Sequence, residues 1–428
     1  MPNGASTAHI YRPKLLTTLA EGYGAEGLRK DLLAGLTVAI VALPLSMAIA
    51  VASGVSPERG LYSSIIGGFL VSALGGSRYQ IGGPAGAFIV LVAATVGKYG
   101  LDGLWLTMML AGIMLVIVGI SRLGALIRHI PQGVTVGFTF GIAITIFASQ
   151  LKDLGGLTLT VPEPGLLFPK LKVLAASLPT LNVYALLIGV ASAALIFALR
   201  RVRPNWPGML MAVALASLAV ALLHLPVETI GARFGELPRG LPAPHLPVFS
   251  WALFRAVLPV SFSFTLLGGV ESLLSAKVAD GMTGRQHRHN MELVAQGIAN
   301  VAAACFGAIS VTGNIARTAT NIRAGARSPL SGILHAVFVL LFLLAAAPVA
   351  RFIPLASLSG VLLVVCWNMA EKDEALKLLQ SFRGAAVLIA TFGLTIFSGL
   401  TLGIVAGCAL AALFWMADRA VQRGPELP

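Results

Sequence analysis

Apolar runs long enough to cross a bilayer recur along almost the whole chain, and they restrict its fold more than any other feature. A helix needs about 20 apolar residues to span the hydrocarbon core. Hydrophobic residues make up 57% of the 428 positions and charged residues only 11%, a balance that soluble globular domains do not show. Because a helix satisfies its own backbone hydrogen bonds in lipid, we predict an all-α polytopic membrane protein.

The runs form two sets of seven, and an internal repeat supports this division. The letters RHIP at 128–131 open the fifth run of the first set, and RFIP at 351–354 opens the fifth run of the second. An odd number of spans per half inverts the second half in the membrane. We therefore predict a 7+7 inverted repeat of about 14 transmembrane segments, with halves at 32–225 and 257–417. The runs lie at 32–52, 61–76, 84–97, 103–121, 132–151, 183–199, 207–225, 257–279, 291–309, 313–326, 329–350, 354–370, 384–399 and 401–417.

Basic residues are about twice as frequent in one set of alternate connections as in the other, and the positive-inside rule places that set in the cytoplasm. Both termini then lie inside, with 1–31 as a cytoplasmic N-terminal segment and 418–428 as a cytoplasmic tail. Residues 371–381 have the pattern of an amphipathic helix on the inner membrane surface. The net charge of +13 follows from this topology, so we expect no nucleic-acid partner.

The sequence contains no motif that would supply ATP-driven or metal-dependent chemistry. It has no GxxxxGK[ST] loop for ATP phosphates. Its three cysteines, Cys305, Cys366 and Cys408, lie far apart in apolar runs and form no metal-binding or disulfide pattern. We therefore expect no enzyme activity, no cofactor and no metal site.

Polar stretches accompany the third run of each set, as in the half-helices of transporters. Residues 310–321 (SVTGNIARTATN) should form a short extended segment and then a helix start, with Arg317 on its first turn. Residues 77–87 (SRYQIGGPAGA) place Pro84 where a first helical residue is expected. Helix starts carry free N–H groups and partial positive charge, and a guanidinium adds to both. The pair predicts an anion site; the alternative is two ordinary loops between spans.

Glu271 alone among the acidic residues lies well inside a predicted span, where a charge costs about 2.5–3.5 kcal/mol on insertion scales. It either pairs with Arg317 to hold two helices together, or gains and loses a proton as the site is loaded. Ser275, one helical turn on, offers a third option, a cation site formed by Glu271 and Ser275. Ser46, in the first run after Pro44, is either a further site residue or a packing residue.

These stretches resemble the SulP family of anion transporters, bacterial relatives of the mammalian sulfate and chloride/bicarbonate solute carriers. The similarity extends over the membrane part, from about residue 28 to residue 417. The first matching segment comprises LPLSMAIA at 43–50, GLYS at 60–63, GGSR at 75–78 and GGP at 82–84. The second comprises RTA at 317–319 and GARSPLSG at 325–332.

The resemblance implies a core domain formed by spans 1–4 and 8–11, and a gate domain formed by spans 5–7 and 12–14. It implies a homodimer in a bacterial-type inner membrane, and transport by an elevator movement of core against gate. The anion site of the family lies between spans 3 and 10 with help from span 1, which carries over to Arg317, Ala316, Gly83, Ala85, Gly86 and Ser46. In proton-coupled members an acidic residue in span 8 does the coupling, which matches Glu271.

Three differences from the family pattern make the expected site less polar. Leu45 stands where many members have Gln, Ile49 where many have an aromatic residue, and Ala316 where many have Ser. The anion therefore stays open among sulfate, bicarbonate and small dicarboxylates. The regulatory STAS domain that usually follows the membrane domain is not among the 428 residues, so the chain is either a naturally short member or a truncated one.

The leading prediction is a secondary active transporter that couples uptake of a small anion to protons through Glu271. An uncoupled anion exchanger or channel, and a sodium-coupled bicarbonate symporter that uses Glu271 and Ser275, are alternatives. A nucleobase permease fits less well, because such proteins bind a neutral ring with an acidic residue in span 10, where this chain has Arg317. A non-transporting scaffold would need neither a lone carboxylate nor a lone arginine inside the membrane.

Overall fold

The computed structural model describes residues 11–422 apart from 125–130, 162, 165, 205 and 399. Most of these residues are helical, which confirms the expected class of membrane protein. Among the described helices, seven are long and apolar enough to cross a membrane by length and composition. They are α2 (Ala25–Ala52), the helix Gly86–Ile120 that joins η3 (Gly86–Phe88) to α5 (Ile89–Ile120), α7 (Gln132–Leu154), α9 (Val183–Val202), α12 (Trp251–Thr283), α15 (Leu330–Ala350), and the stretch Leu355–Leu379 that holds α16 (Leu355–Met369) and α17 (Lys372–Leu379).

Shorter elements complete the described path of the chain. Three of them contain shorter apolar helical stretches: α10 (Gly208–Leu223), α18 (Phe382–Ser398), and Leu402–Met416 within α19 (Leu400–Gln422). The others are α1 (Lys14–Ala20), α3 (Glu58–Tyr62), the π-helix η2 (Ser63–Gly67), α4 (Gly68–Leu74), α8 (Leu167–Ala176), η4 (Leu178–Thr180), α11 (Ile230–Phe234), α13 (His289–Cys305) and α14 (Ile315–Arg323).

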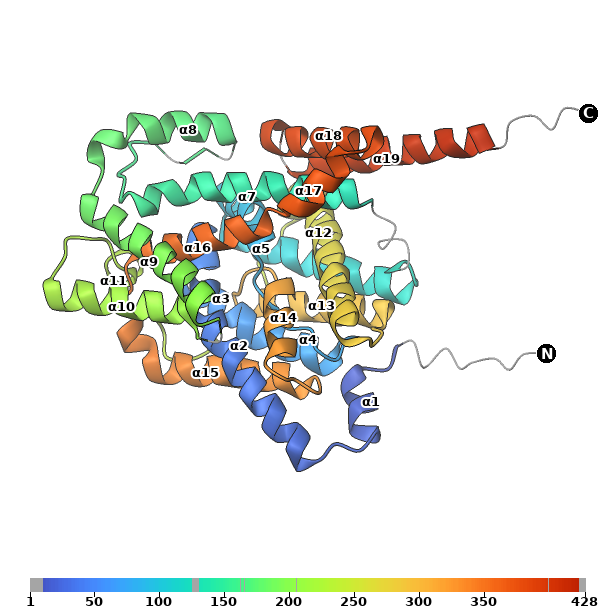
Figure 1. The fold of residues 1–428 in the computed structure, drawn as a ribbon, viewed down its shortest axis with the longest axis horizontal. Helices are drawn as coiled ribbons and strands as arrows, with labels where there is room; N and C mark the ends of the chain where they lie inside the picture. The colour runs from blue at the N-terminus through green and yellow to red at the C-terminus, as the bar shows by residue number, and fades with distance from the viewer. Residues whose placement is uncertain are drawn as a thin grey trace, which may run out of the picture.

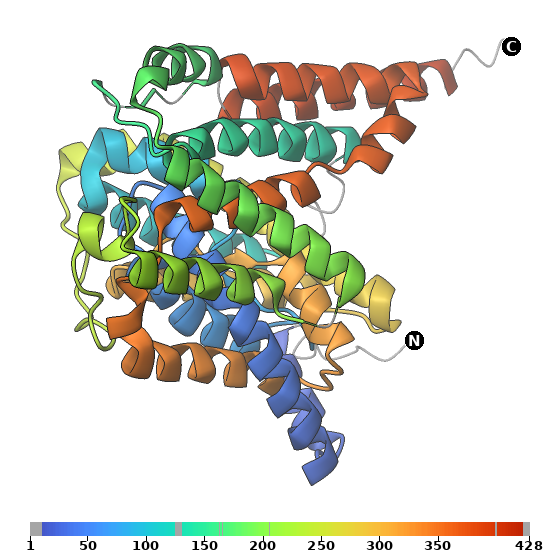
Figure 2. The ribbon, with the colours of Figure 1, turned by 60° about the vertical axis from the view of Figure 1, so that its left-hand side comes forward.

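The helices pack as two bundles. The first bundle contains α2, α4, α5, α12, α13, α14 and α15, and the second contains α7, α9, α10, α16, α18 and α19. Both views show α7, α18 and α19 together along the upper side of the molecule, away from α15 (Figures 1 and 2). The bundles meet where α16 and α10 pack on α2.

A pair of two-residue strands joins chain segments that are far apart in the sequence. Strand β1 (Gly82–Gly83) pairs antiparallel with β2 (Thr312–Gly313), with Gly82 opposite Gly313 and Gly83 opposite Thr312. The pairing continues where the backbone N–H of Asn314 donates to the carbonyl of Ile81 at 2.9 Å. Each strand leads to a helix, so the pair places the starts of Gly86–Ile120 and α14 beside each other.

Two fully buried carboxylates connect the two halves of the chain near the strand pair, one from each half. Asp31 on α2 accepts hydrogen bonds from the backbone N–H groups of Arg327 (2.6 Å) and Ser328 (3.1 Å), which follow α14. Glu292 on α13 accepts from those of Gly76 (2.9 Å) and Ser77 (3.0 Å), which precede β1. Charge-assisted bonds of this kind are among the stronger ones in proteins. They fix the loops that hold the two helix starts in place.

Asp31 has one further partner near the N-terminus. The hydroxyl of Tyr23 donates to its Oδ2 at 2.6 Å. Burial and this hydrogen bond raise the pKa of Tyr23. The phenol therefore stays protonated and keeps donating to the carboxylate at ordinary pH.

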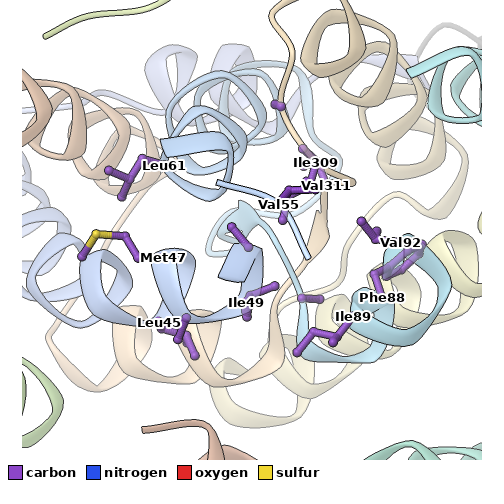
Figure 3. Packing of buried hydrophobic residues seen from close by; sticks show 14 of the residues in the cluster. Leu45, Met47, Ile49, Val55, Leu61, Phe88, Ile89, Val92, Ile309 and Val311 are labelled. Atoms are coloured by element: carbon purple, nitrogen blue, oxygen red, sulfur yellow. The ribbon is translucent and has the colours of Figure 1, made fainter. Parts of the chain in front are cut away.

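Apolar side chains surround the strand pair. Figure 3 shows Ile49 of α2, Phe88 at the end of η3, and Val311 just before β2 among the buried residues of one continuous cluster. Ile49 and Phe88 are each 2% exposed. The start of Gly86–Ile120 therefore lies in surroundings of low dielectric constant, where its partial charge acts more strongly than in water.

The structure corrects two expectations about element boundaries. Helix α2 begins at Ala25, so residues 25–31 extend the first long helix beyond the apolar run at 32–52. Pro84 is not the first helical residue, because the helix starts at Gly86 after an extended Ala85. The third and fourth apolar runs are two helical segments that meet at a kink at Gly100, where φ is 71° and ψ −172°, so the separation of these two runs is confirmed.

Other expectations are confirmed or lie outside the described residues. Residues 372–379 form α17 within the expected amphipathic segment. Helix α14 begins at Ile315 after an extended segment, and Arg317 lies on its first turn as predicted. Three residues of the expected repeat motif, at 128–130, lie outside the described residues, as do residues 1–10 and 423–428 of the expected cytoplasmic segments.

Candidate functional site

Arg317 lies at the centre of the candidate site. Asn314 is the N-cap of α14, and its side-chain oxygen accepts from the backbone N–H of Arg317 at 3.2 Å. This local bond orients the first turn and directs the side chain towards α2 and η2. There Nη1 donates to Oγ of Ser64 and Nη2 to Oγ of Ser46, each at 2.9 Å. The two serine oxygens are 2.7 Å apart.

Among the residues that the structure describes, the guanidinium of Arg317 has no anionic partner. Arg317 is 1% exposed, and Ser46 and Ser64 are fully buried. None of the ion pairs found within the described ranges includes Arg317, and its Nε–H has no hydrogen-bond partner. Because a buried charge is costly unless it is paired, this arrangement favours an added anion.

The first half-helix starts against the same guanidinium. A Cβ atom placed on Gly83 would lie only 2.3 Å from Nη1 of Arg317, so the close approach needs glycine. Ala85 and Gly86 are buried at the start of Gly86–Ile120, whereas Ala316 is exposed at the start of α14. The N–H groups of two helix starts and the charge of Arg317 therefore meet within one small region.

Glu271 reaches this region through β2 rather than through Arg317. Its Oε2 accepts a long hydrogen bond of 3.4 Å from Oγ1 of Thr312. The neighbouring Ser272 accepts from the backbone N–H of Gly313 at 3.3 Å. Glu271 forms no ion pair with Arg317, so the structure does not support the interpretation that the two simply neutralise each other.

The expected cation site is only partly assembled. Oγ of Ser275 donates to Oγ1 of Thr318 at 3.2 Å. Thr318 in turn accepts from the backbone N–H of Ile81 at 3.1 Å. Ser275 is therefore engaged with the first turn of α14, and no hydrogen bond within the described residues joins it to Glu271.

The structure thus brings Ser46, Gly83 and Arg317 into direct contact. Glu271 contacts Thr312, the residue that pairs with Gly83. Sequence reasoning missed Ser64. The Ser63–Ser64 pair in an apolar run was the available signal, but the π-helix η2 alters the direction of its side chains. It also missed Met369 of α16, which lies over Gly86.

Comparison with known proteins gives consistent matches. Residues 28–392 match the sulfate permease family. The chain is 44% identical over 399 residues to the putative sulfate transporter YvdB of Bacillus subtilis, covering 92% of this chain and 75% of that protein. It is 30% identical to the bicarbonate transporter BicA of Synechocystis, covering 90% of this chain and 69% of that protein.

Solved structures share the fold. The transmembrane domain of a cyanobacterial bicarbonate transporter BicA superposes with a TM-score of 0.79 at 28% identity, covering 91% of this chain and 98% of that one. The murine anion transporter Slc26a9 in its inward-facing state superposes with a TM-score of 0.87 at 19% identity, covering 98% of this chain and 73% of that one. The second likeness concerns the fold alone.

Proposed function

The chain belongs to the sulfate permease family, and from this premise we propose that it is a secondary active transporter of small anions. The family and its named relatives are transporters rather than enzymes. The relatives named as sulfate and bicarbonate transporters support the substrate class of sulfate, bicarbonate or a small dicarboxylate. The low polarity around the helix starts leaves the choice among these open.

One observation carries this proposal. Arg317 is a fully buried cation between two helix starts, with serine hydroxyls as partners and an unpaired Nε–H. A nucleobase permease would need hydrogen-bond acceptors at this position, which a guanidinium lacks. An anion bound at Gly86 and Ala316 would gain the partial charges of both helices and the field of Arg317.

The larger architecture is proposed on the same basis. The antiparallel strand pair and the two adjacent helix starts support a 7+7 inverted repeat of about 14 spans. The first bundle would be the core and the second the gate of an elevator, in a homodimer of the inner membrane with both termini in the cytoplasm. Glu271 would couple transport to protons. Sodium-coupled bicarbonate symport is the second candidate, supported by similarity to the BicA proteins.

Uptake by the purified protein in proteoliposomes tests the proposed function. Labelled sulfate, bicarbonate and succinate should be compared with an uncharged nucleobase, each with no gradient, with an inward proton gradient and with a sodium gradient. We expect uptake of at least one anion, and accumulation that follows the proton gradient. Uptake of the nucleobase alone would contradict the proposal, and accumulation that follows sodium would favour the second candidate.

Valine at either glycine of the first half-helix start should impair uptake. A Cβ at Gly83 would meet the guanidinium at 2.3 Å, and one at Gly86 would meet Sδ of Met369 at 3.1 Å. We expect Gly83→Val and Gly86→Val to raise the apparent KM at least about tenfold, the size of effect that small steric changes in a site produce. Gly97→Val, in the same half-helix with nothing within 4 Å of the added Cβ, is the matched control. Equal KM values in all three variants would show that neither glycine borders the anion.

A further inference from the structure

The last residue of α16 covers the start of the first half-helix. A Cβ on Gly86 would lie 3.1 Å from Sδ and 3.9 Å from Cε of Met369, and 3.8 Å from Cγ1 of Val365. Both side chains are partly buried against the central apolar cluster. Helix α16 belongs to the second bundle and Gly86 to the first, so this contact lies where one bundle meets the candidate anion site of the other.

Contacts within the second bundle hold this end of α16 in position. Asn368 accepts from Nη1 of Arg200 at 2.9 Å, and the ring of Trp367 packs edge to face on Phe197, both partners lying on α9. The ammonium group of Lys372, the first residue of α17, lies over the ring of Trp367. The chain turns between these helices at Ala370, which has φ −70° and ψ 93°. Met369 is therefore fixed at its Cα while its thioether stays adaptable.

The group that Met369 covers is one that would hold the anion, because Gly86 offers its backbone at a helix start. Met369 brings no charge and no strong hydrogen-bonding group. Met369 would affect binding through its volume, because the size of its side chain limits the space next to Gly86.

We propose that Met369 is a specificity-determining residue, which forms the wall of the anion site on the second bundle and limits the size of the anion. This inference rests on the proposed function. With methionine present, compact anions such as sulfate and bicarbonate fit between the two bundles, and a longer dicarboxylate is disfavoured by its second carboxylate and spacer. Shortening the side chain to alanine admits the longer anion.

Competing uptake of sulfate and succinate tests the proposal. Met369→Ala should raise the ratio of kcat/KM for succinate to that for sulfate by on the order of tenfold. Met369→Leu keeps the volume and should leave the ratio within about twofold of the unmodified protein. Met416→Ala, at an exposed methionine on α19, is the matched control and should leave the ratio unchanged. An unchanged ratio in Met369→Ala overturns the inference while leaving the proposed function intact, whereas no anion uptake by the unmodified protein overturns both.

Thiol labelling provides a readout that does not depend on turnover. Met369→Cys is made in a background in which Cys305, Cys366 and Cys408 are replaced by alanine, and is labelled with a charged methanethiosulfonate. We expect sulfate to slow the labelling severalfold, whereas succinate should protect less. Met282→Cys at the end of α12, where Met282 is 40% exposed, should label at the same rate with and without sulfate. Labelling of Met369→Cys that is insensitive to every anion contradicts contact with the site.

Discussion

Arg317→Ala should abolish uptake of every anion that the unmodified protein transports. The change removes the one full positive charge at the helix starts, together with donors worth about 1.5–3 kcal/mol each when charged. Loss of two such interactions, about 3–6 kcal/mol together, lowers kcat/KM by at least about 10²-fold. Arg323→Ala, in the last turn of the same helix, is the matched control and should transport normally. The measurement is initial uptake into proteoliposomes over a range of anion concentrations.

A second variant at this position, Arg317→Met, separates a binding role from a structural role. Arg317 lies buried without an anionic partner, so its removal relieves the cost of burying a charge, about 2.5–3.5 kcal/mol on insertion scales. Ser46 and Ser64 can still bond each other, since their oxygens are 2.7 Å apart. We therefore expect an unchanged or higher Tm for Arg317→Met, with uptake lost. A large drop in Tm would mean that Arg317 holds the fold together, and persistent uptake would mean that the anion binds elsewhere.

Glu271→Gln should uncouple transport from the proton gradient without stopping it. An arriving anion adds negative charge beside β2, which raises the proton affinity of the carboxyl group that contacts Thr312. In the proposed coupling, a proton then binds with the anion and the two cross together. Glutamine mimics the protonated side chain permanently. The variant should exchange labelled for unlabelled anion at a rate within a few-fold of normal, yet an imposed pH gradient should no longer concentrate the anion.

The position of Glu271 modifies the mechanism expected from the sequence. Its partner is Thr312 rather than Arg317, so in the proposed mechanism the anion would act on Glu271 through the electric field and the strand pair, not by displacing an ion pair. Glu371→Gln is the matched control, because this second carboxyl group lies between α16 and α17, at the N-cap of α17. Accumulation that still follows the pH gradient in Glu271→Gln, or is lost only in Glu371→Gln, would exclude Glu271 as the coupling residue.

Signals between neighbouring residues, such as an N-cap, correctly predicted the parts of the site that depend only on the local chain. Asn314 is an N-cap residue, and that signal placed Arg317 on the first turn of α14 correctly. Apolar length identified the long helices. The hydrophobic pattern failed at α2, because the polar residues 25–31 continue the helix beyond the apolar run. Pro84 failed as a predicted helix start because the chain stays extended through Ala85 and the helix begins only at Gly86.

Tertiary contacts account for what the sequence could not predict. Ser64 contacts Arg317 although 253 residues separate them in the sequence. The π-helix η2 sets the direction of the Ser64 side chain, and the residue pattern does not predict a π-helix there. Met369 was read as the end of a span, because nothing near it in the sequence indicates Gly86. Glu292 was placed near a span end and given no role, although it caps two backbone N–H groups more than 200 residues away.

The two buried carboxylates also bear on how the protein is made. Asp31 is synthesised 297 residues before Ser328, and a ribosome adding 5–20 residues per second needs roughly 15–60 s to supply this partner. During that interval Tyr23 is the one hydrogen-bond partner of Asp31 that has already been synthesised. The N–H groups of Gly76 and Ser77 likewise lack Glu292, their acceptor in the folded protein. The first half of the chain therefore enters the membrane with an unfinished interior. Completion of these contacts depends on late translation, so a ribosome stalled between the halves would leave Asp31, Gly76 and Ser77 without their partners from the second half.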